Sequence, residues 1–566
     1  MHFLNRLNVD EINTWFAGNE GIPFKGDSIS TVDKLPSILR WEHTDGDKYC
    51  YLYYIDKENK DDFDFYVPRM ISVEPLAKIG NERLTRYFPS VDFSNNRMRE
   101  SNDMAIACLL KIANKDNTAI FCGRKDSANK ILQRIIDLHN RQYDISSLKK
   151  RASENEISRL ANLIKKNYGE TNFLYSAAQL GVFAHHRGIT DGVKNSIEYA
   201  LRKALITNVV CTSTLAQGVN LPIKYLVISS IYQSNEQIKV RDFHNLIGRT
   251  ARSGMFTEGT IIFSDPFVYG NRNNDWKWRK YKELLDFENS EKCSSVLLDI
   301  VRSKEIENHK YTFFNIALRY YDEREKLTEE ITTYFYKHNN DQLKNWYNHI
   351  IKTLGKLENY IATIIADNDN TYSDDLVDEM LSGTLAETLA TDDEKTNLRE
   401  LFVKICEYLM RTMPEEQVKR NFSKSLIKSE DYIALQGEVT SLDYDEMTHD
   451  DLLEFLLKMI MKYGSTNNLN KMESVEQVVD LAKLWMQGTS YHTIKNLGFL
   501  YDFKIMKRGN YVELAVEDIL AICDGDFGYS ASLIISSIVE ILSCIVYSID
   551  FCYLVAIWQN YADLLL

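Results

Sequence analysis

The sequence lacks most of the signatures that assign a chain to a narrow class. None of its nine cysteines forms a Cys-x-x-Cys pair, and their scattered positions give neither a disulfide framework nor a zinc-ligand pattern. The first residues lack the apolar core of a secretory signal. These absences exclude a small disulfide-rich secreted protein and indicate reduced thiols in a cytoplasmic protein.

Proline, glycine and positive net charge are also scarce. The 566 residues include 8 prolines and 24 glycines, which excludes collagen-like and low-complexity chains. A hydrophobic share of 44% and a charged share of 26% are those of a soluble globular protein, and the length predicts three or four compact units. A net charge of -14 excludes a surface that collects nucleic acid everywhere, so such binding needs a local groove.

Only one hydrophobic run is long enough to need a membrane argument. Residues 533–558, LIISSIVEILSCIVYSIDFCYLVAIW, have the length of a membrane span. Glu540 and Asp550 interrupt the run, and no partner charge lies inside it. We therefore expect a buried pair of bundle helices there and no membrane partner.

The apolar pattern changes along the chain. Residues 1–100 alternate short apolar runs with polar turns, which predicts edge strands of a sheet. Residues 101–270 alternate short apolar runs with amphipathic helices, which predicts an α/β domain with a parallel sheet and helices on both faces. After residue 270 the spacing predicts a mainly α-helical region. The predicted strands are 118–123, 206–212, 225–230 and 259–264. The helical region divides into 271–365, 366–465 and 466–566.

A cluster of hydroxyl residues follows the predicted strand 206–212. Thr212, Ser213 and Thr214 come at its carboxyl end, where ligands of parallel sheets bind. Hydroxyls and backbone amides in such a loop can contact phosphate oxygens of a nucleic-acid strand, and Gly218 permits close backbone approach. The alternative is an ordinary turn capped by a hydroxyl, which is the commoner role for such residues in isolation.

Two arginines stand close together in FHNLIGRTARSG. Arg249 and Arg252 are three residues apart, one turn of a helix, so both guanidinium groups can point the same way. Two convergent arginines suit the charge that develops on a transferred phosphoryl group. The alternative is a solvated basic face, which leaves the small neighbours Gly248 and Ala251 unexplained.

These stretches resemble superfamily-two nucleic-acid helicases of the superkiller-type branch, which are DEAD/DEAH-box-like. TSTLAQGVNLP and NLIGRTAR are similar to motifs V and VI, in the family's order and at its separation. TAIFCGRKDSANKI resembles motif IV, and residues 183–222 match the run between motifs IV and V. The resemblance covers residues 118–265. It implies the second of two RecA-like domains in a motor that couples ATP hydrolysis to movement along single-stranded DNA or RNA.

The resemblance also implies roles for single residues. Arg252 would be the arginine finger at the ATP γ-phosphate, with Arg249 as its phosphate partner, and these two are the implied catalytic residues. The implied ATP-binding residues are Gly218, Asn220 and Asn245. The implied nucleic-acid-binding residues are Gly123, Arg124, Thr212, Ser213 and Thr214. Two positions depart from the branch, because Asn245 replaces a glutamine and Ala251 replaces a glycine.

The sequence contains no P-loop and no acidic motif that would place Mg2+. The pair Gly355-Lys356 lies in a helical pattern and follows no strand, and the segment from residue 8 resembles the one after motif III. We therefore expect ATP with Mg2+ to be bound mainly by a missing first RecA-like domain, on a separate chain or a missing amino-terminal part. Residues 1–100 would link that domain to the second. This chain alone should not hydrolyse ATP.

Three further stretches of the sequence bear on the fold and on metal binding. Residues 478–494 and 524–542 resemble the helical bundle that follows the motor, and the family implies a winged helix within 271–365. His185 and His186 have no Cys, Asp or Glu at ligand spacing, so packing and backbone contact are expected rather than a metal site. Residues 367–379 have the rhythm of a calcium loop, but Tyr372 occupies its obligatory glycine position.

Two hypotheses remain open. The first is the carboxyl-terminal motor half of an ATP-dependent helicase or translocase, which the two arginines favour. The alternative is a non-catalytic subunit that binds nucleic acid or a partner protein, which Ala251 and the missing domain favour. Low proline usage and divergent flanking segments favour an antiviral defence helicase of the Hachiman type, which adds a nuclease as a candidate partner.

Overall fold

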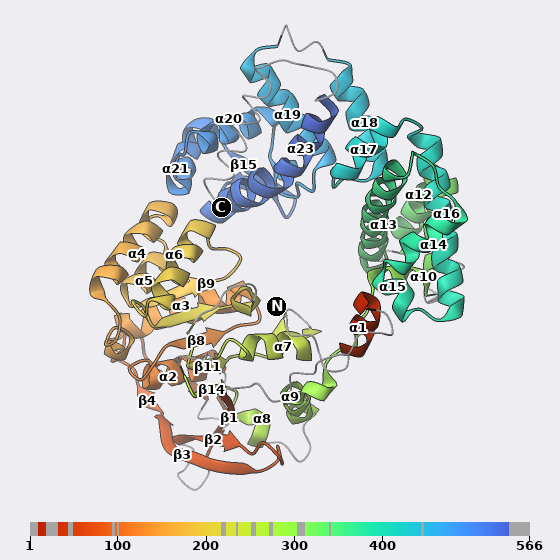
Figure 1. Ribbon diagram of the computed structural model, residues 1–566. Coiled ribbons are helices and arrows are strands. Elements are labelled where there is room, and N and C mark those ends of the chain that lie inside the picture. Colours follow the sequence, from red (N-terminus) through yellow and green to blue (C-terminus); the bar gives the residue numbers. More distant parts are fainter. Residues whose placement is uncertain are drawn as a thin grey trace.

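The computed structural model of the protein describes most of the chain (Figure 1). The described residues are 9–17, 32–42, 49–92, 97–98, 101–216, 222–233, 236–250, 256–270, 276–302, 312–338, 341–442 and 447–542. In Figure 1 a unit built on a sheet lies at the lower left, and green to blue helices lead round the right and the top. The elements are thus arranged as a ring.

An eight-stranded sheet forms the core of the first unit. Its strands in spatial order are β3 (Phe63–Ser72), β2 (Tyr49–Ile55), β1 (Asp33–Trp41), β14 (Glu258–Phe263), β11 (Tyr225–Ile228), β8 (Thr118–Phe121), β10 (Asn208–Cys211) and β9 (Val182–His185). The six from β1 to β9 are parallel to their neighbours, whereas β2 and β3 are antiparallel. All residues of β8, β9 and β10 are buried, as a covered parallel sheet requires. The predicted α/β fold is confirmed.

The edge strands predicted in residues 1–100 belong to this same sheet. β1 pairs in parallel with β14, so that Leu35 lies opposite Thr260, and β2 and β3 extend the sheet beyond β1. Shorter strand pairs lie elsewhere in the unit. They are β4 (Glu74–Pro75) with β5 (Tyr87–Phe88), β6 (Val91–Asp92) with β7 (Arg97–Met98), and β12 (Tyr232–Gln233) with β13 (Glu236–Gln237).

Helices cover the sheet where amphipathic sequence follows a strand. In α3 (Lys125–Asn140) the buried side chains Ala128, Ile131, Leu132, Ile135 and Leu138 recur at helical spacing. The other helical elements of this unit are α2 (Ser101–Ile112), η4 (Ser146–Leu148), α4 (Glu154–Tyr168), α5 (Phe173–Gln179), α6 (Asp191–Arg202), η5 (Ser213–Ala216), α7 (Val240–Ile247), α8 (Phe267–Gly270), α9 (Trp276–Leu285) and η6 (Phe287–Asn289).

The rest of the described chain is mainly helical, as predicted. Its helices are α10 (Val296–Val301), α11 (Phe313–Asp322), α12 (Arg324–His338), α13 (Asp341–Asp367), α14 (Asp374–Ser382), α15 (Leu385–Leu389), α16 (Asp392–Thr412), α17 (Glu416–Lys424), α18 (Ser429–Thr440), α19 (His449–Tyr463), η8 (Leu469–Lys471), α20 (Val475–Met486), α21 (Tyr491–Tyr501), α22 (Val516–Leu520), the π-helix η9 (Ala521–Ser530) and α23 (Ala531–Leu542). One hairpin, β15 (Lys504–Lys507) with β16 (Asn510–Glu513), interrupts them. The described residues within 271–365 contain no strand, and the winged helix expected in this range stays a prediction. The division of the chain into domains stays a prediction.

The long apolar run near the carboxyl terminus is partly described. Among the described residues, 516–542 is the one helical stretch whose length and composition suit a membrane crossing, and half of its most apolar window is buried inside the molecule. α23 packs against α17, α18 and α19, and Lys424 Nζ donates a 2.7 Å hydrogen bond to the Glu540 carboxylate. Residues 543–558 of the run lie outside the described chain.

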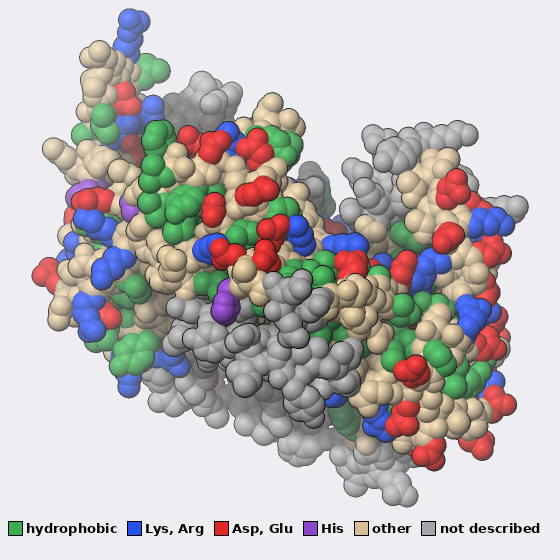
Figure 2. Space-filling view, turned by 90° about the horizontal axis from the view of Figure 1, so that it is seen from above, with side chains coloured by type: hydrophobic (Ala, Val, Ile, Leu, Met, Phe, Trp, Pro, Cys, Tyr) green, Lys and Arg blue, Asp and Glu red, His purple; other side chains and the backbone are tan. Residues whose placement is uncertain are grey.

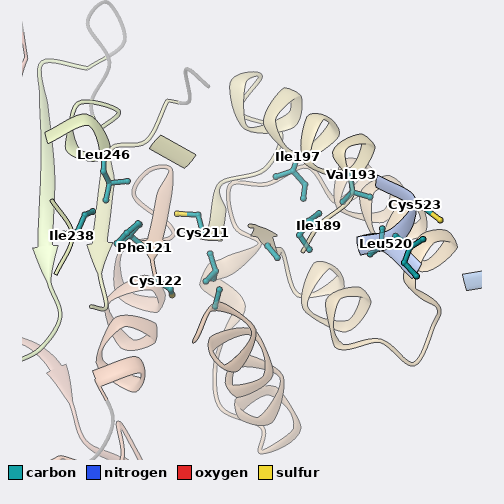
Figure 3. Close-up of a cluster of buried hydrophobic side chains, with 14 of the residues drawn as sticks. Phe121, Cys122, Ile189, Val193, Ile197, Cys211, Ile238, Leu246, Leu520 and Cys523 are labelled. Atoms are coloured by element: carbon teal, nitrogen blue, oxygen red, sulfur yellow. The ribbon is translucent and has the colours of Figure 1, made fainter. Parts of the chain in front are cut away.

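The last helices pack back onto the first unit. α21 lies against α4, and a Cβ built on Gly169 would be 2.6 Å from the His492 ring. Figure 3 shows Val193 of α6 beside Leu520 and Cys523, and all three side chains are buried. The small first helix α1 (Val9–Ala17) contacts the middle of the chain, where Trp15 Nε1 donates to Gly383 O at 3.1 Å.

Candidate nucleic-acid interface

The predicted strand-binding residues follow β8 and β10, and the turn after β9 lies beside them. Phe121 at the end of β8 pairs with Cys211 at the end of β10, which pairs with His185 at the end of β9. Because parallel strands end at one edge, the loops after them emerge side by side. This edge therefore gathers Gly123 and Arg124, the 186–188 turn and the 212–214 loop.

The hydroxyl loop is attached to the neighbouring strand β9. Thr212 is buried, and its amide donates to His185 O at 3.2 Å. Thr214 Oγ1 donates to the same carbonyl at 3.1 Å. Ser213 is half-buried and begins η5. Thr212 and Thr214 thus have a structural role through His185 O, a partner that the sequence does not predict, while their role in strand binding stays a prediction.

Gly123 lies where another segment crosses the loop after β8. A Cβ built on Gly123 would be only 1.6 Å from Tyr232 O, the backbone carbonyl at the start of β12. The absence of a side chain is therefore required by packing between two backbone segments. The predicted phosphate contact is a separate property that this packing neither requires nor excludes.

Gly123→Ala is expected to lower the free energy of unfolding by about 2–3 kcal/mol, because the Tyr232 carbonyl must move to admit a methyl group. Denaturant unfolding of both proteins measures the change. Gly192→Ala in α6 is the matched control, since a Cβ there meets no atom within 4 Å. The control should change stability by less than about 1 kcal/mol. Equal effects of the two substitutions would contradict the packing account.

Basic side chains lie on both sides of the hydroxyl loop. Arg124 is the extended N-cap residue of α3 and is exposed, as is Lys125 beside it. On the other side Arg187, which follows the end of β9, is also exposed. The sequence analysis did not predict Arg187, although this residue directly follows the paired histidines His185 and His186. The edge offers cations that can contact a phosphate backbone.

His186 holds the turn that carries Arg187. Its Nδ1 accepts a 3.1 Å hydrogen bond from the Gly188 amide, and its Nε2 lies 2.8 Å from Asn129 Oδ1 on α3. Burial lowers the pKa of His186 to about 4, so the ring is neutral at pH 7 and Nε2 carries the proton. These hydrogen bonds are of the kind predicted for this histidine, namely packing and backbone contact.

The lowered pKa of His186 makes stability depend on pH. The unfolded histidine binds a proton near pH 6.5 and the folded one only near pH 4, so its contribution is full above pH 6.5 and is lost as pH falls towards 4. Between pH 7 and pH 5 the wild-type protein should lose about 2 kcal/mol more unfolding free energy than His186→Gln. Urea titrations at both pH values measure this. Equal losses in the two proteins would contradict it.

The motif with the two arginines is only partly helical. α7 ends at Ile247, the Arg249 amide donates to Leu246 O at 3.0 Å, and Thr250 forms a parallel bridge with Ile223. The prediction that Arg249 sits in a helical turn with Arg252 is therefore wrong for Arg249, because Gly248 ends the helix. Asn245 and Arg249 are half-buried. The predicted residues Gly218, Asn220 and Arg252 lie outside the described residues.

Segments that follow the sheet hold α7 in place. The Glu291 carboxylate accepts hydrogen bonds from the Val240 and Arg241 amides, at 2.8 and 3.2 Å, and so caps the start of the helix. His244 Nε2 lies 3.0 Å from Leu284 O on α9, and burial lowers the pKa of this histidine. The orientation of Asn245 and Arg249 is thus fixed by contacts that sequence spacing does not reveal.

The surface charge of the described residues is mixed. Figure 2 shows acidic and basic side chains interspersed over the face seen from above, without one basic field across its described part. This agrees with the net charge of -14 and favours local contacts at the strand ends. Among the residues that the structure describes, no group of three or more His, Cys, Asp or Glu side chains could hold a metal ion.

Three curated proteins show what the chain is similar to, and no protein-family model matches it. The Hachiman protein HamB of Bacillus cereus is 21% identical over 459 residues, which are 76% of this chain and 38% of HamB. A POLQ-like helicase of Caenorhabditis elegans is 26% identical over 237 residues, 39% of this chain and 24% of that protein. The ATP-dependent DNA helicase Hel308 of Aeropyrum pernix is 35% identical over 95 residues, 16% of this chain and 13% of that protein.

These similarities confirm the resemblance that the motifs predict. The chain is related to superfamily-two helicases and is similar to a Hachiman protein. It spans 38% of the length of HamB and smaller shares of the other two proteins. What the complete relatives do is therefore carried to this chain only as a proposal.

Proposed function

Because the chain is related to superfamily-two helicases, we propose that it is the strand-contacting half of an ATP-dependent helicase or translocase. The arrangement that carries this proposal is the shared edge of β8, β10 and β9, where loops with hydroxyl, amide and guanidinium donors emerge together. Donors of these kinds position a nucleic-acid backbone without selecting a base sequence. Single-stranded DNA or RNA is the proposed ligand.

In this proposal Arg124, Arg187 and Ser213 contact phosphate oxygens of the strand. Arg124 and Arg187 are exposed. They follow β8 and β9, the two strands on either side of β10. The loop amides between them add further donors. Gly123 and the two threonines hold the loops in place, so they act on the strand mainly through backbone position.

ATP with Mg2+ is the proposed cofactor of the complete motor, and its hydrolysis would supply the free energy for movement. The described residues supply part of one side of a nucleotide site. Near the end of α7, Asn245 provides an amide and Arg249 a guanidinium group. Arg252, Gly218 and Asn220 would complete this side. The opposite side, with the P-loop and the acidic residues for Mg2+, would come from another domain or chain.

An antiviral role and a nuclease partner are proposed from the similarity to a Hachiman protein. The alternative function is a non-catalytic subunit in which the same edge grips nucleic acid but no arginine acts on ATP. Strand binding is common to both functions. The dependence of ATP turnover on Arg252 separates them.

Fluorescence anisotropy with a labelled single-stranded oligonucleotide tests the proposal. The purified chain should bind it, and the dissociation constant should rise steeply as salt rises, since phosphate contacts release counterions. Alanine at both Arg124 and Arg187 should weaken binding at least about tenfold and reduce the salt dependence. Glu154→Gln on α4, an exposed site away from the strand ends, is the control. Absence of salt-sensitive binding would contradict the proposed function.

A further inference from the structure

A buried hydrogen-bond chain joins α6 to the hydroxyl loop. Glu198 Oε1 lies 2.8 Å from His185 Nε2, and His185 Nδ1 lies 3.1 Å from Thr214 Oγ1. The side chain of His185 is 2% exposed and that of Glu198 is 13% exposed. Three side chains from α6, β9 and η5 therefore form one continuous connection, most of it shielded from water.

The geometry restrains the loop from two directions. Thr214 Oγ1 reaches both the ring and the backbone carbonyl of His185, while the Thr212 amide bonds to that same carbonyl. A buried imidazole without the Glu198 carboxylate would lose the partner of its outer nitrogen and would turn more freely. The orientation of Thr214 then depends on a residue that does not itself reach the strand-binding edge.

α6 is a rigid support for this connection. Thr190 caps its start by accepting a 3.3 Å hydrogen bond from the Val193 amide, and the Thr190 amide donates to the Tyr168 hydroxyl at 2.8 Å. Val193 packs beside Leu520 of the returning helices (Figure 3). Glu198 therefore has a fixed position relative to both the sheet and the carboxyl-terminal helices.

We propose that Glu198 and His185 are positioning residues for nucleic-acid binding. They fix Thr214 so that η5 presents Ser213 and its backbone amides to the strand. The inference rests on the proposed function for its ligand, but the restraint on the loop exists without any ligand.

The direction in which strand affinity changes when the Glu198 charge is removed distinguishes positioning from a purely electrostatic role. Glu198→Ala removes a negative charge near a proposed polyanion site together with the partner of His185 Nε2, and a purely electrostatic role would strengthen strand binding. Positioning predicts the opposite, a dissociation constant about fivefold higher or more for a 20-residue single-stranded oligothymidylate in anisotropy titrations. Glu154→Ala on α4 carries the same charge change and should leave the constant within about twofold.

A double-mutant cycle tests whether Glu198 acts through Thr214. Thr214→Val removes the hydroxyl with little change of shape and should weaken binding about as much as Glu198→Ala. The double variant should be no weaker than either single variant, because both break one connection. His185→Gln, which keeps a donor and an acceptor, should bind more tightly than His185→Ala. Additive losses, or stronger binding by Glu198→Ala, would overturn the proposal.

Hydrogen exchange separates this inference from the proposed function. In the free protein, Glu198→Ala should raise amide exchange of residues 211–216 severalfold and leave β8 unchanged. If the wild-type chain bound no oligonucleotide but showed this change, the proposed function would fail and the restraint would stand. Unchanged exchange in 211–216 would overturn the positioning role whatever the binding result.

Discussion

Arg252→Ala is expected to lower ATP turnover at least about a thousandfold in an assembly that contains the phosphate-holding domain, because an arginine finger contributes that much to phosphoryl transfer. The same substitution should leave single-strand affinity within about twofold, since the proposed strand contacts lie after β8, β9 and β10. A coupled phosphate-release assay at saturating oligonucleotide measures the loss. The chain by itself should show no turnover, because its sequence contains no P-loop.

Arg241→Ala is the matched control for this experiment. Arg241 is exposed on α7, beside Asp242 at 3.7 Å, and faces the start of the helix rather than the motif end. Its loss should change turnover by less than about twofold. ATP turnover of Arg252→Ala within tenfold of wild type would instead support the non-catalytic alternative, in which no arginine of this chain acts on ATP.

Asp103→Ala is expected to lower the free energy of unfolding by about 3–5 kcal/mol. Asp103 is fully buried, and its carboxylate accepts from Arg134 Nε and Nη2 at 3.0 Å each. It also accepts from the Ser90 amide and hydroxyl, at 2.8 and 2.6 Å. Alanine would leave these donors without their buried acceptor, which costs more than the pair itself contributes.

Asp299→Ala serves as the control for the Asp103 substitution. Asp299 is exposed in the first turn of α10, so its loss should change stability by about 0.5 kcal/mol or less. Denaturant unfolding of the two variants beside wild type measures both effects. A loss below about 1 kcal/mol for Asp103→Ala would show that this network does not hold the 74–92 segment to α2 and α3.

The strands of the sheet were predictable where the apolar runs were short and bounded. The predicted strands at 118–123, 206–212 and 225–230 contain β8, β10 and β11, and the one at 259–264 overlaps β14, which begins one residue earlier. The parallel pairing of β1 with β14 was not predictable, because it joins segments far apart in the sequence. Local patterns specify which residues form a strand, whereas the partner depends on how the whole chain packs.

The site was predictable in its location but not in its internal contacts. The motif resemblance implied strand contacts for Arg124 and for the hydroxyl loop, and the register of β8 with β10 brings both to one sheet edge. The resemblance did not reveal that Thr214 is held by His185, or that Gly123 is small because Tyr232 O crosses it. Such contacts depend on which residues lie close together in the folded chain. A single sequence gives the residue types but not these distances.

Photochemical crosslinking tests the central claim most directly. A single-stranded oligonucleotide with a photoreactive base at its centre is irradiated with the chain, and crosslinked peptides are identified by mass spectrometry. The account predicts crosslinks within 123–125, 186–188 and 212–216, which competing unlabelled strand and high salt abolish. Crosslinks confined to the helices beyond residue 276, with none at the carboxyl ends of β8, β9 and β10, would contradict it.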